Sequence, residues 1–329
     1  MNIAPLVLGM VLNWAADPWL TIQPGHGPAA GKRVVLVSGD EEYRSEEMLP
    51  QLARILARQG FSCVVLFAVD PQDGAVCPNV TDNIPGLHHL RSADLLILFT
   101  RFRNLPDDQM RHLAAYVESG KPIIGLRTAT HAFKLSEGAF RRFSWDSAEP
   151  QWEGGFGRRV LGETWISHHG IHGKEGTRGV PAPGQTAHPI LRGIKPGSLF
   201  SPTDVYTVRL PLTGDAVPLV LGEVTETMDP GSAPVAAKND PMMPVAWIRS
   251  YRGESGKTAR VFTCTMASAQ DLVHEGNRRL LVHAGLWAVG LEDRIREGLD
   301  VSLAGRYSPS PFGFRDHAAW KPGKTPAAW

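Results

Sequence analysis

Residues 120–131, GKPIIGLRTATH, form the stretch from which the fold of this chain is interpreted. A short apolar run, residues 122–126, follows a helix-stopping glycine and ends in small polar residues. This pattern is typical of a buried parallel strand that turns sharply into a polar loop. In open α/β sheets such strand ends face the ligand crevice. Arg127, Thr128, Thr130 and His131 are therefore the first candidates for binding or chemistry.

Apolar runs and helical patterns alternate before this stretch. Strands are predicted at residues 33–38, 62–68 and 94–100, and helical spacing follows the first and the third. Such alternation indicates βαβ units and predicts an α/β fold, a flavodoxin-like and mostly parallel sheet with helices on both faces. In that strand order the first and third strands diverge, which would gather residues 40–44, 101–103 and 127–131 around one crevice.

The remaining chain divides into three kinds of segment. Strands are predicted at 217–223, 244–250 and 258–265, the last two as a hairpin, and a closing helix at 277–289. Residues 136–184 have little periodicity, which predicts a long irregular insertion that covers the site. The expected organisation is an N-terminal arm or weak signal segment over 1–31, one α/β domain over 32–293 and an extended tail over 294–329.

Composition excludes several classes of protein. The formal net charge is +1, which gives no electrostatic case for a nucleic-acid or anionic-membrane partner. Three cysteines without a CxxC pair exclude a disulfide framework or a cysteine-based zinc site. The apolar run at 3–12 is too short to span a bilayer, and it has the length of a signal peptide without a preceding basic residue. A cytoplasmic and an exported or periplasmic location both stay open, as does a homo-oligomer.

Charged residues follow the first and third predicted strands. Glu42 is predicted to act as a general acid or base, with Glu41, Arg44 and Arg103 as substrate-binding groups. The alternative for residues 40–44 is a solvated acidic loop at a helix start.

Arg127 stands at the strand end where a nucleophile is often found, but arginine stays protonated and cannot attack. It is predicted to be a substrate clamp, with Thr128 beside it. Replacing Arg127 by alanine is therefore predicted to abolish turnover and to leave the melting temperature nearly unchanged. The alternative is a salt bridge to the loop of Glu41 and Glu42. His131 lies about one helical turn further and is predicted to be a general base, against the alternative of a packed, structural histidine.

An HHxxH cluster lies in the predicted insertion. His168 and His169 are predicted to move protons near neutral pH, and His172 to contact substrate. The alternative is a divalent metal held by His168, His169 and Glu175, although the glycines in the cluster favour a loop over a metalloprotease helix. A third interpretation is a solvated loop. No other cofactor is expected.

Four motifs together resemble the ThuA-like family, named for trehalose utilisation. They are KPIIGLRTATHAF, TAHPILRGI, PVAWIRSYRGESGKTARVFTCTMAS and NRRLLVHAGLWAVGLED, and they span about residues 32–293. The resemblance implies a class I glutamine amidotransferase-like fold and a carbohydrate as the small-molecule partner. Amidotransferases carry a cysteine where Arg127 stands here, so the resemblance does not extend to glutamine amidotransferase chemistry.

The sequence therefore predicts an enzyme that acts on a sugar or keto-sugar derivative by acid–base chemistry, without a covalent nucleophile. Lyase, isomerase and hydrolase reactions stay open. One alternative is a non-catalytic carbohydrate-binding or scaffold protein with Trp145, Trp152 and Trp165 as stacking surfaces. The other is a histidine-dependent metallohydrolase.

Overall fold

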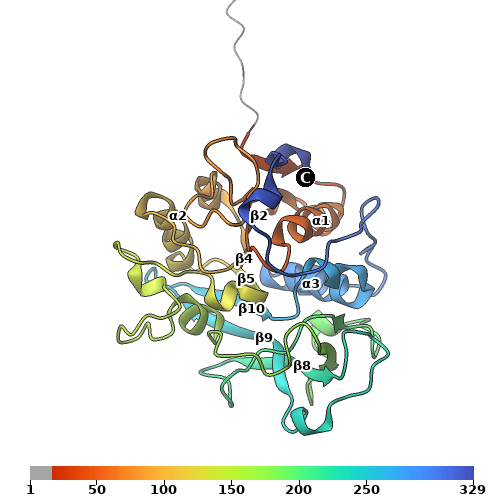
Figure 1. The fold of residues 1–329 in the computed structure, drawn as a ribbon. Coiled ribbons are helices and arrows are strands. Elements are labelled where there is room, and N and C mark those ends of the chain that lie inside the picture. Colours follow the sequence, from red (N-terminus) through yellow and green to blue (C-terminus); the bar gives the residue numbers. More distant parts are fainter. Residues whose placement is uncertain (1–16) are drawn as a thin grey trace, which may run out of the picture.

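The computed structural model describes residues 17–329. Its centre is one sheet of ten strands (Figure 1). Five adjacent strands are parallel and follow the flavodoxin-like order expected from the sequence. In order across the sheet they are β3 (Ser62–Phe67), β2 (Arg33–Gly39), β4 (Leu95–Thr100), β5 (Ile123–Leu126) and β10 (Thr258–Cys264).

The other five strands are antiparallel to their neighbours, so the sheet is mixed and the prediction of a mostly parallel sheet is not confirmed. They are β1 (Trp19–Ile22) at one edge, then β9 (Met243–Arg252), β8 (Val217–Thr225), β6 (Gly176–Pro181) and β7 (Phe200–Ser201) beyond β10. The predicted hairpin of β9 and β10 is confirmed, and it reverses the strand direction without the crossover helix that a parallel pair requires.

Three strands come from segments in which none was predicted, and the shortest of them, β7, pairs with β6. β1 lies in the predicted N-terminal arm and pairs with β3, while β6 lies in the predicted insertion and pairs with β8. Both are short and contain few alternating apolar residues, so their pairing partners and not their own pattern place them in the sheet. The signal-like run at residues 3–12 lies outside the described residues.

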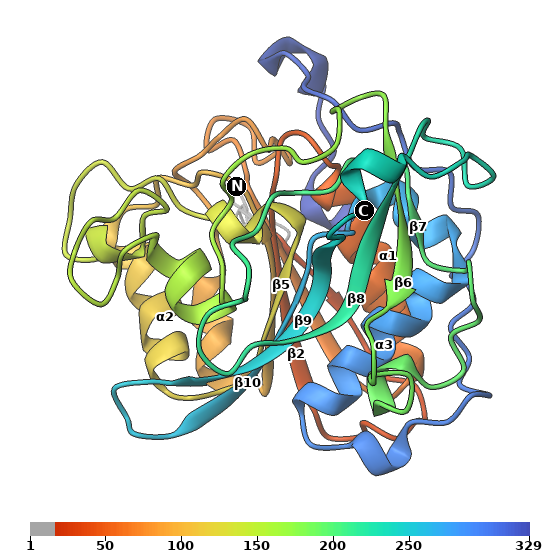
Figure 2. The same cartoon turned by 90° about the horizontal axis from the view of Figure 1, so that it is seen from below.

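Helices cover both faces of the parallel strands, as predicted. α1 (Ser45–Arg58) and α3 (Glu275–Ala288) lie on one face, and α2 (Asp107–Glu118) lies on the other (Figure 2). Because successive side chains of a strand point to opposite faces, Leu36 of β2 joins the core under α1 while Val35 and Val37 join the core under α2. In residues 17–329 we find no helix long and apolar enough to cross a membrane.

The C-terminal segment, residues 294–329, runs back over the domain as an extended strap with a few single turns. Figure 1 shows its last part in dark blue beside α1. Gly313 donates its backbone N–H to the carbonyl of Glu42, and Val76 donates to that of Lys324. The strap therefore reaches the loop that follows β2, where the sequence analysis places candidate residues.

Candidate functional site

Strained backbone marks the crevice at the strand ends. Arg44, Phe102 and Arg127 follow β2, β4 and β5 and have positive φ angles of 60°, 49° and 42°. Such conformations cost about 1–3 kcal/mol each in non-glycine residues and cluster at functional sites. The buried carboxylate of Asp40 joins two of these loops, because it accepts the N–H groups of Glu42 and Tyr43 and the hydroxyl of Thr128. The backbone N–H of Phe102 donates to the carbonyl of His131 at 3.0 Å, so the predicted gathering of the three loops is confirmed.

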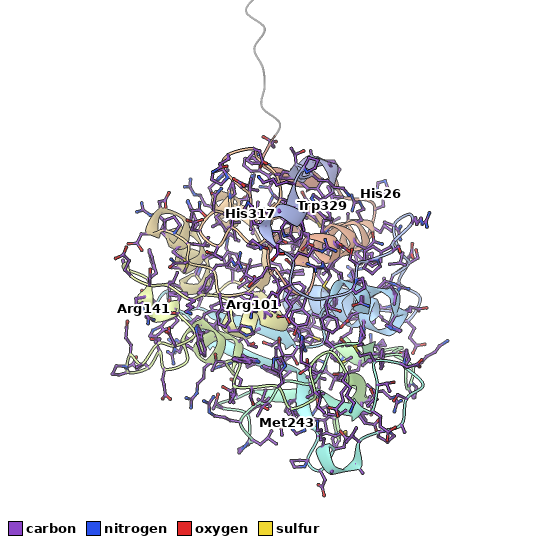
Figure 3. The ribbon with its side chains drawn as sticks, in the orientation of Figure 1. His26, Arg101, Arg141, Met243, His317 and Trp329 are labelled. Carbon is purple, nitrogen blue, oxygen red and sulfur yellow. The ribbon has the colours of Figure 1, made fainter. Side chains whose placement is uncertain are left out.

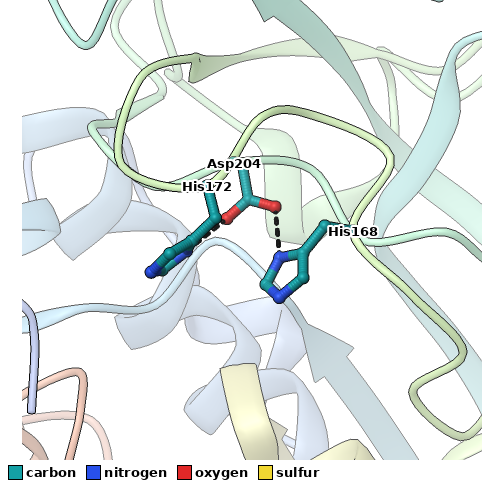
Figure 4. Close-up of side chains that lie close together, drawn as sticks. All are labelled: His168, His172 and Asp204. Atoms are coloured by element: carbon teal, nitrogen blue, oxygen red, sulfur yellow. Dashed lines mark hydrogen bonds and ion pairs between the residues drawn. The ribbon is translucent and has the colours of Figure 1, made fainter.

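A buried carboxylate, Asp204, is the centre of the polar cluster in the crevice (Figure 4). His168 Nδ1 lies 2.6 Å from Asp204 Oδ2, and His172 Nδ1 lies 3.2 Å from Asp204 Oδ1. Arg127 Nη2 lies 3.1 Å from the same Oδ1. Burial alone would raise the pKa of Asp204, but these histidine hydrogen bonds and the charge of Arg127 hold the pKa of Asp204 well below its usual range.

His172 lies between two carboxylates. Its Nε2 is 3.1 Å from Glu42 Oε1, on the side opposite to Asp204. The hydrogen bonds to Asp204 and Glu42 raise the pKa of His172 to about 9, so the ring is an imidazolium cation at neutral pH. Glu42 Oε2 continues the chain to Arg101 Nε at 3.5 Å.

His168 keeps an open side. Its Nδ1 is engaged by Asp204, and no residue in the described part of the chain forms a hydrogen bond with Nε2. The side chain is 37% exposed. An imidazole with one nitrogen fixed by a carboxylate and the other free is suited to take up and return a proton.

Aromatic rings form a wall beside His168. The ring centroids of Trp165 and Tyr206 lie 5.7 and 5.6 Å from that of His168. Phe102 and Trp145 continue this wall, with centroids 5.5 Å apart. Trp152, predicted with Trp145 and Trp165 as a stacking surface, instead packs on Phe143, 4.7 Å away in the core under α2.

His131 is buried behind this wall. Its ring packs on Phe102 at 4.8 Å, and its Nδ1 lies 3.2 Å from Thr130 Oγ1. Burial, and next the positive charges of Arg101 and Arg127, hold the pKa of His131 well below its usual range. The ring is therefore neutral, and the geometry is that of the packed alternative and not of an accessible base.

Arg127 is held on all sides by the protein. Its Nη1 donates to the carbonyls of Asp204 at 2.7 Å and Thr265 at 2.9 Å, and its guanidinium lies between the rings of Tyr206 and Tyr43, 3.8 and 4.5 Å away. The side chain is 1% exposed. The alternative prediction of a salt bridge to Glu41 or Glu42 is wrong, because the partner is Asp204. The guanidinium orients Asp204 and is not positioned as a substrate clamp.

Three further predicted binding residues, Glu41, Arg103 and Arg44, also form ion pairs or hydrogen bonds with other groups of the protein. Glu41 is bound by Arg101 and by Arg103, whose Nη2 lies 2.6 Å from Glu41 Oε2. Arg103 is fully buried and also donates to three backbone carbonyls. Arg44 donates to the carbonyls of Pro311 and Gly313 and so fixes the C-terminal strap.

Arg101 follows directly after β4 and pairs with both Glu41 and Glu42, but it stays partly exposed; Figure 3 labels it. Its side chain is 21% exposed and lies over the rings of Phe102 and Phe314 at 4.8 and 5.0 Å. It was not among the predicted binding residues, although it belongs to the loop that the predicted strand order brings to the crevice.

The predicted metal set of His168, His169 and Glu175 does not come together. His169 Nε2 lies 2.7 Å from the carbonyl of Lys238, and Glu175 forms an ion pair of 2.7 Å with the ammonium of Lys238. The atoms of ligand type that do lie within 4.8 Å of one another belong to His168, His172 and Asp204. The chain turns at Gly170, where a Cβ atom would lie 2.9 Å from that of Asp204, so glycine permits this approach.

The C-terminal strap adds a residue that sequence reasoning missed. Phe312 stacks on Tyr43 with centroids 5.6 Å apart, and its ring lies 5.4 Å from that of His172. Only the proline-rich composition of the tail signalled that it lies across the domain.

The stability that His172 contributes is expected to depend on pH. Because its pKa is raised from 6.5 to about 9, the charged ring stabilises the fold fully below about pH 6.5 and progressively less as the pH rises through 9. Urea unfolding of the wild type and of His172→Gln between pH 6 and pH 10 should therefore show a difference in unfolding free energy that shrinks as the pH rises. His26→Gln, at an exposed position, is the control with no difference. A difference for His172→Gln that is the same at pH 6 and pH 10 would contradict the imidazolium.

Comparisons with known proteins give structural neighbours only. No family model matches the chain, and a search of curated proteins finds no match. A structure from Parabacteroides merdae is 14% identical with a TM-score of 0.48, over 86% of this chain and 95% of its own. One from Bacteroides uniformis is 11% identical with a TM-score of 0.49, over 80% and 94%. Both are provisionally described as ThuA-like, the family that the sequence motifs resemble. A likeness at this level carries no argument about activity.

Proposed function

We propose that this protein is an enzyme that acts on a sugar or keto-sugar derivative by acid–base chemistry, without a covalent nucleophile. The observation that carries the proposal is His168, whose Nδ1 is fixed 2.6 Å from the buried Asp204 while the ring remains accessible. A carboxylate in this position holds the imidazole in one tautomer and stabilises the imidazolium that forms when Nε2 takes a proton.

The neighbours of His168 suit a carbonyl substrate. A sugar ring stacked on the partly exposed Trp165 would present a C–H bond beside its carbonyl group to His168 Nε2. The proton moves to Nε2, and the electron pair of the C–H bond forms an enolate whose charge rests on the carbonyl oxygen. Arg101, which is 21% exposed and also paired with Glu41 and Glu42, supplies a cation for that oxygen. The imidazolium of His172 adds positive charge, although both its nitrogens are engaged. In a lyase reaction the enolate reforms the carbonyl group and the C–O bond of the next carbon breaks, and the departing oxygen takes the proton from Nε2. In an isomerisation the hydroxyl proton of the deprotonated carbon passes to the enolate oxygen, that carbon becomes the new carbonyl, and the former carbonyl carbon takes the proton from Nε2.

Two observations support chemistry without a covalent nucleophile. The strand end after β5 carries Arg127, which stays protonated. The three cysteines of the chain are free and buried, and burial raises the pKa of Cys264 to about 12, so a reactive thiolate is disfavoured.

The proposal is tested by proton exchange in D₂O. The protein is incubated with glucose, trehalose and their keto derivatives, and NMR follows deuterium at the carbon beside the carbonyl group together with loss of the starting sugar. Exchange or turnover with a keto derivative that disappears in Asp204→Asn is the expected result, because the amide no longer stabilises the imidazolium of His168. Binding of the sugars without exchange or turnover would overturn the proposal and favour the carbohydrate-binding alternative.

A second candidate, a metallohydrolase, rests on the ligand atoms of His168, His172 and Asp204 that lie within 4.8 Å of one another. An ion there would replace the hydrogen bonds between the histidines and Asp204, and it would lie beside the cation of Arg127, which disfavours it. The same assay distinguishes the two. Activity that a chelator removes and added zinc or manganese restores would assign the site to a metal.

A further inference from the structure

A cavity of about 760 Å³ lies between α1 and the C-terminal strap, and none of its lining residues belongs to the His168 cluster. The outer face of α1 forms one wall, with Gln51 and Arg54. Residues 304–310 and the turns around Trp320 and Trp329 form the other walls. Figure 1 shows the strap beside α1, and Figure 3 labels Trp329 at its end. The volume falls in the range of small-molecule sites, about 300–1,000 Å³.

The charges that line this cavity are unbalanced. Four lining side chains are basic, and the only acidic one is Glu47. One oxygen of Glu47 is already engaged, because Oε2 accepts the N–H of Ser310 at 2.6 Å. The basic side chains are Arg54, Arg306, Arg315 and Lys324. Arg54 donates from Nη2 to the backbone oxygen of Trp329, the last residue. Among residues 17–329, no aspartate or glutamate side chain lies within salt-bridge distance of any of the four. The cavity therefore carries an excess of positive charge, which attracts anions.

Aromatic rings hold two of these cations without neutralising them. The guanidinium of Arg315 lies 5.3 Å from the ring centre of Trp320, and the ammonium of Lys324 lies 4.8 Å from that of Trp329. Cation–π contacts of this kind restrict a side chain but leave its N–H groups free to donate. Backbone donors add to them, since the N–H groups of Gly305, Arg306 and Ser308 have no acceptor among the described residues.

We propose that this cavity is a binding site for a small organic phosphate, a phosphate monoester of about the size of a hexose phosphate. A dianionic phosphate offers three acceptor oxygens, and guanidinium groups match their geometry. Trp320, which is 7% exposed, and the half-buried Tyr307 and Trp329 supply apolar walls for the organic part of the ligand. The site is independent of the proposed acid–base chemistry, because it shares no residue with it.

Calorimetric titration of the full chain tests this site with four probes at constant ionic strength: a hexose phosphate, the same hexose without phosphate, inorganic phosphate and sulfate. The hexose phosphate is expected to bind more tightly than either inorganic anion. The neutral hexose is expected not to compete with the hexose phosphate. Arg306→Ala and Arg315→Ala should each weaken the hexose phosphate about tenfold or more, the usual effect of losing one charge-assisted hydrogen bond.

Arg141→Ala is the matched control, since it removes a partly exposed arginine that Figure 3 labels well away from Trp329. Its affinity for the hexose phosphate should equal that of the wild type. Unchanged affinity in both Arg306→Ala and Arg315→Ala would overturn the proposal, as would absence of binding by every phosphate. Equal affinity for the hexose phosphate and inorganic phosphate would show that the site does not recognise the organic part of the ligand. Thermal unfolding of the variants without ligand shows whether a loss of affinity results from a loss of folded structure. Arg306→Ala is expected to fold like the wild type, because Arg306 is exposed.

Discussion

Replacing Arg127 by alanine is expected to lower the free energy of unfolding by about 3–5 kcal/mol, the usual cost of removing one partner of a buried ion pair. The change leaves Asp204 fully buried without its closest guanidinium and removes the donors to two backbone carbonyls. It also opens the space between the rings of Tyr43 and Tyr206. A clamp exposed to substrate would have left the melting temperature nearly unchanged, and the burial of Arg127 reverses that expectation. Urea unfolding followed by tryptophan fluorescence measures the loss.

The matched control for Arg127→Ala is Arg260→Ala. Arg260 forms an ion pair with Glu292 at 2.8 Å, but its side chain is 42% exposed. Exposed pairs contribute about 0–1 kcal/mol, so this variant should lose 1 kcal/mol or less. Equally small losses of unfolding free energy in both variants would show that the ion pair of Arg127 with Asp204 does not stabilise the fold. Arg127 would then again be a candidate substrate clamp.

Replacing His168 by asparagine is expected to reduce the rate of proton exchange about 10²–10⁴-fold, the range for loss of a general base. The asparagine side chain still provides a donor for Asp204, but it has no nitrogen that takes a proton. Because the side chain of His168 is 37% exposed, the free energy of unfolding should change little. The fall should appear in kcat, while KM changes less, since the aromatic wall that would bind the substrate remains. The measurement is the rate of deuterium incorporation with the keto derivative that exchanges.

His169→Asn is the control for His168→Asn, in the next residue of the same loop. His169 turns away and meets the carbonyl of Lys238, so its replacement should leave the exchange rate within a few-fold of the wild type. Comparable losses in the two variants would contradict the assignment of the base to His168. An unaffected rate in His168→Asn would remove the histidine from the mechanism altogether.

Local patterns in the sequence predicted the parallel strands, the three long helices and the loops that meet at the crevice. The apolar run before Arg127 is buried as β5, and the run at 33–38 is β2, because continuous β-branched segments are stable only when both faces are covered. The antiparallel extension was only partly predicted. β6 contains two glycines and a proline, and its position depends on pairing with β8, which lies about forty residues later.

The sequence by itself determined that charged and aromatic residues gather at the ends of adjacent parallel strands, because strand direction and the alternation of elements follow from local periodicity. Only the tertiary structure decided which of them are open to a substrate. Arg127 is neutralised by Asp204, 77 residues away, and His168 is oriented by the same carboxylate, 36 residues away. The spacing of residues along the sequence does not predict such long-range contacts. Since burial and long-range partners set the charge and accessibility of a side chain, the stretch at 120–131 supplies the frame of the site, and residues 168–204 supply its accessible base.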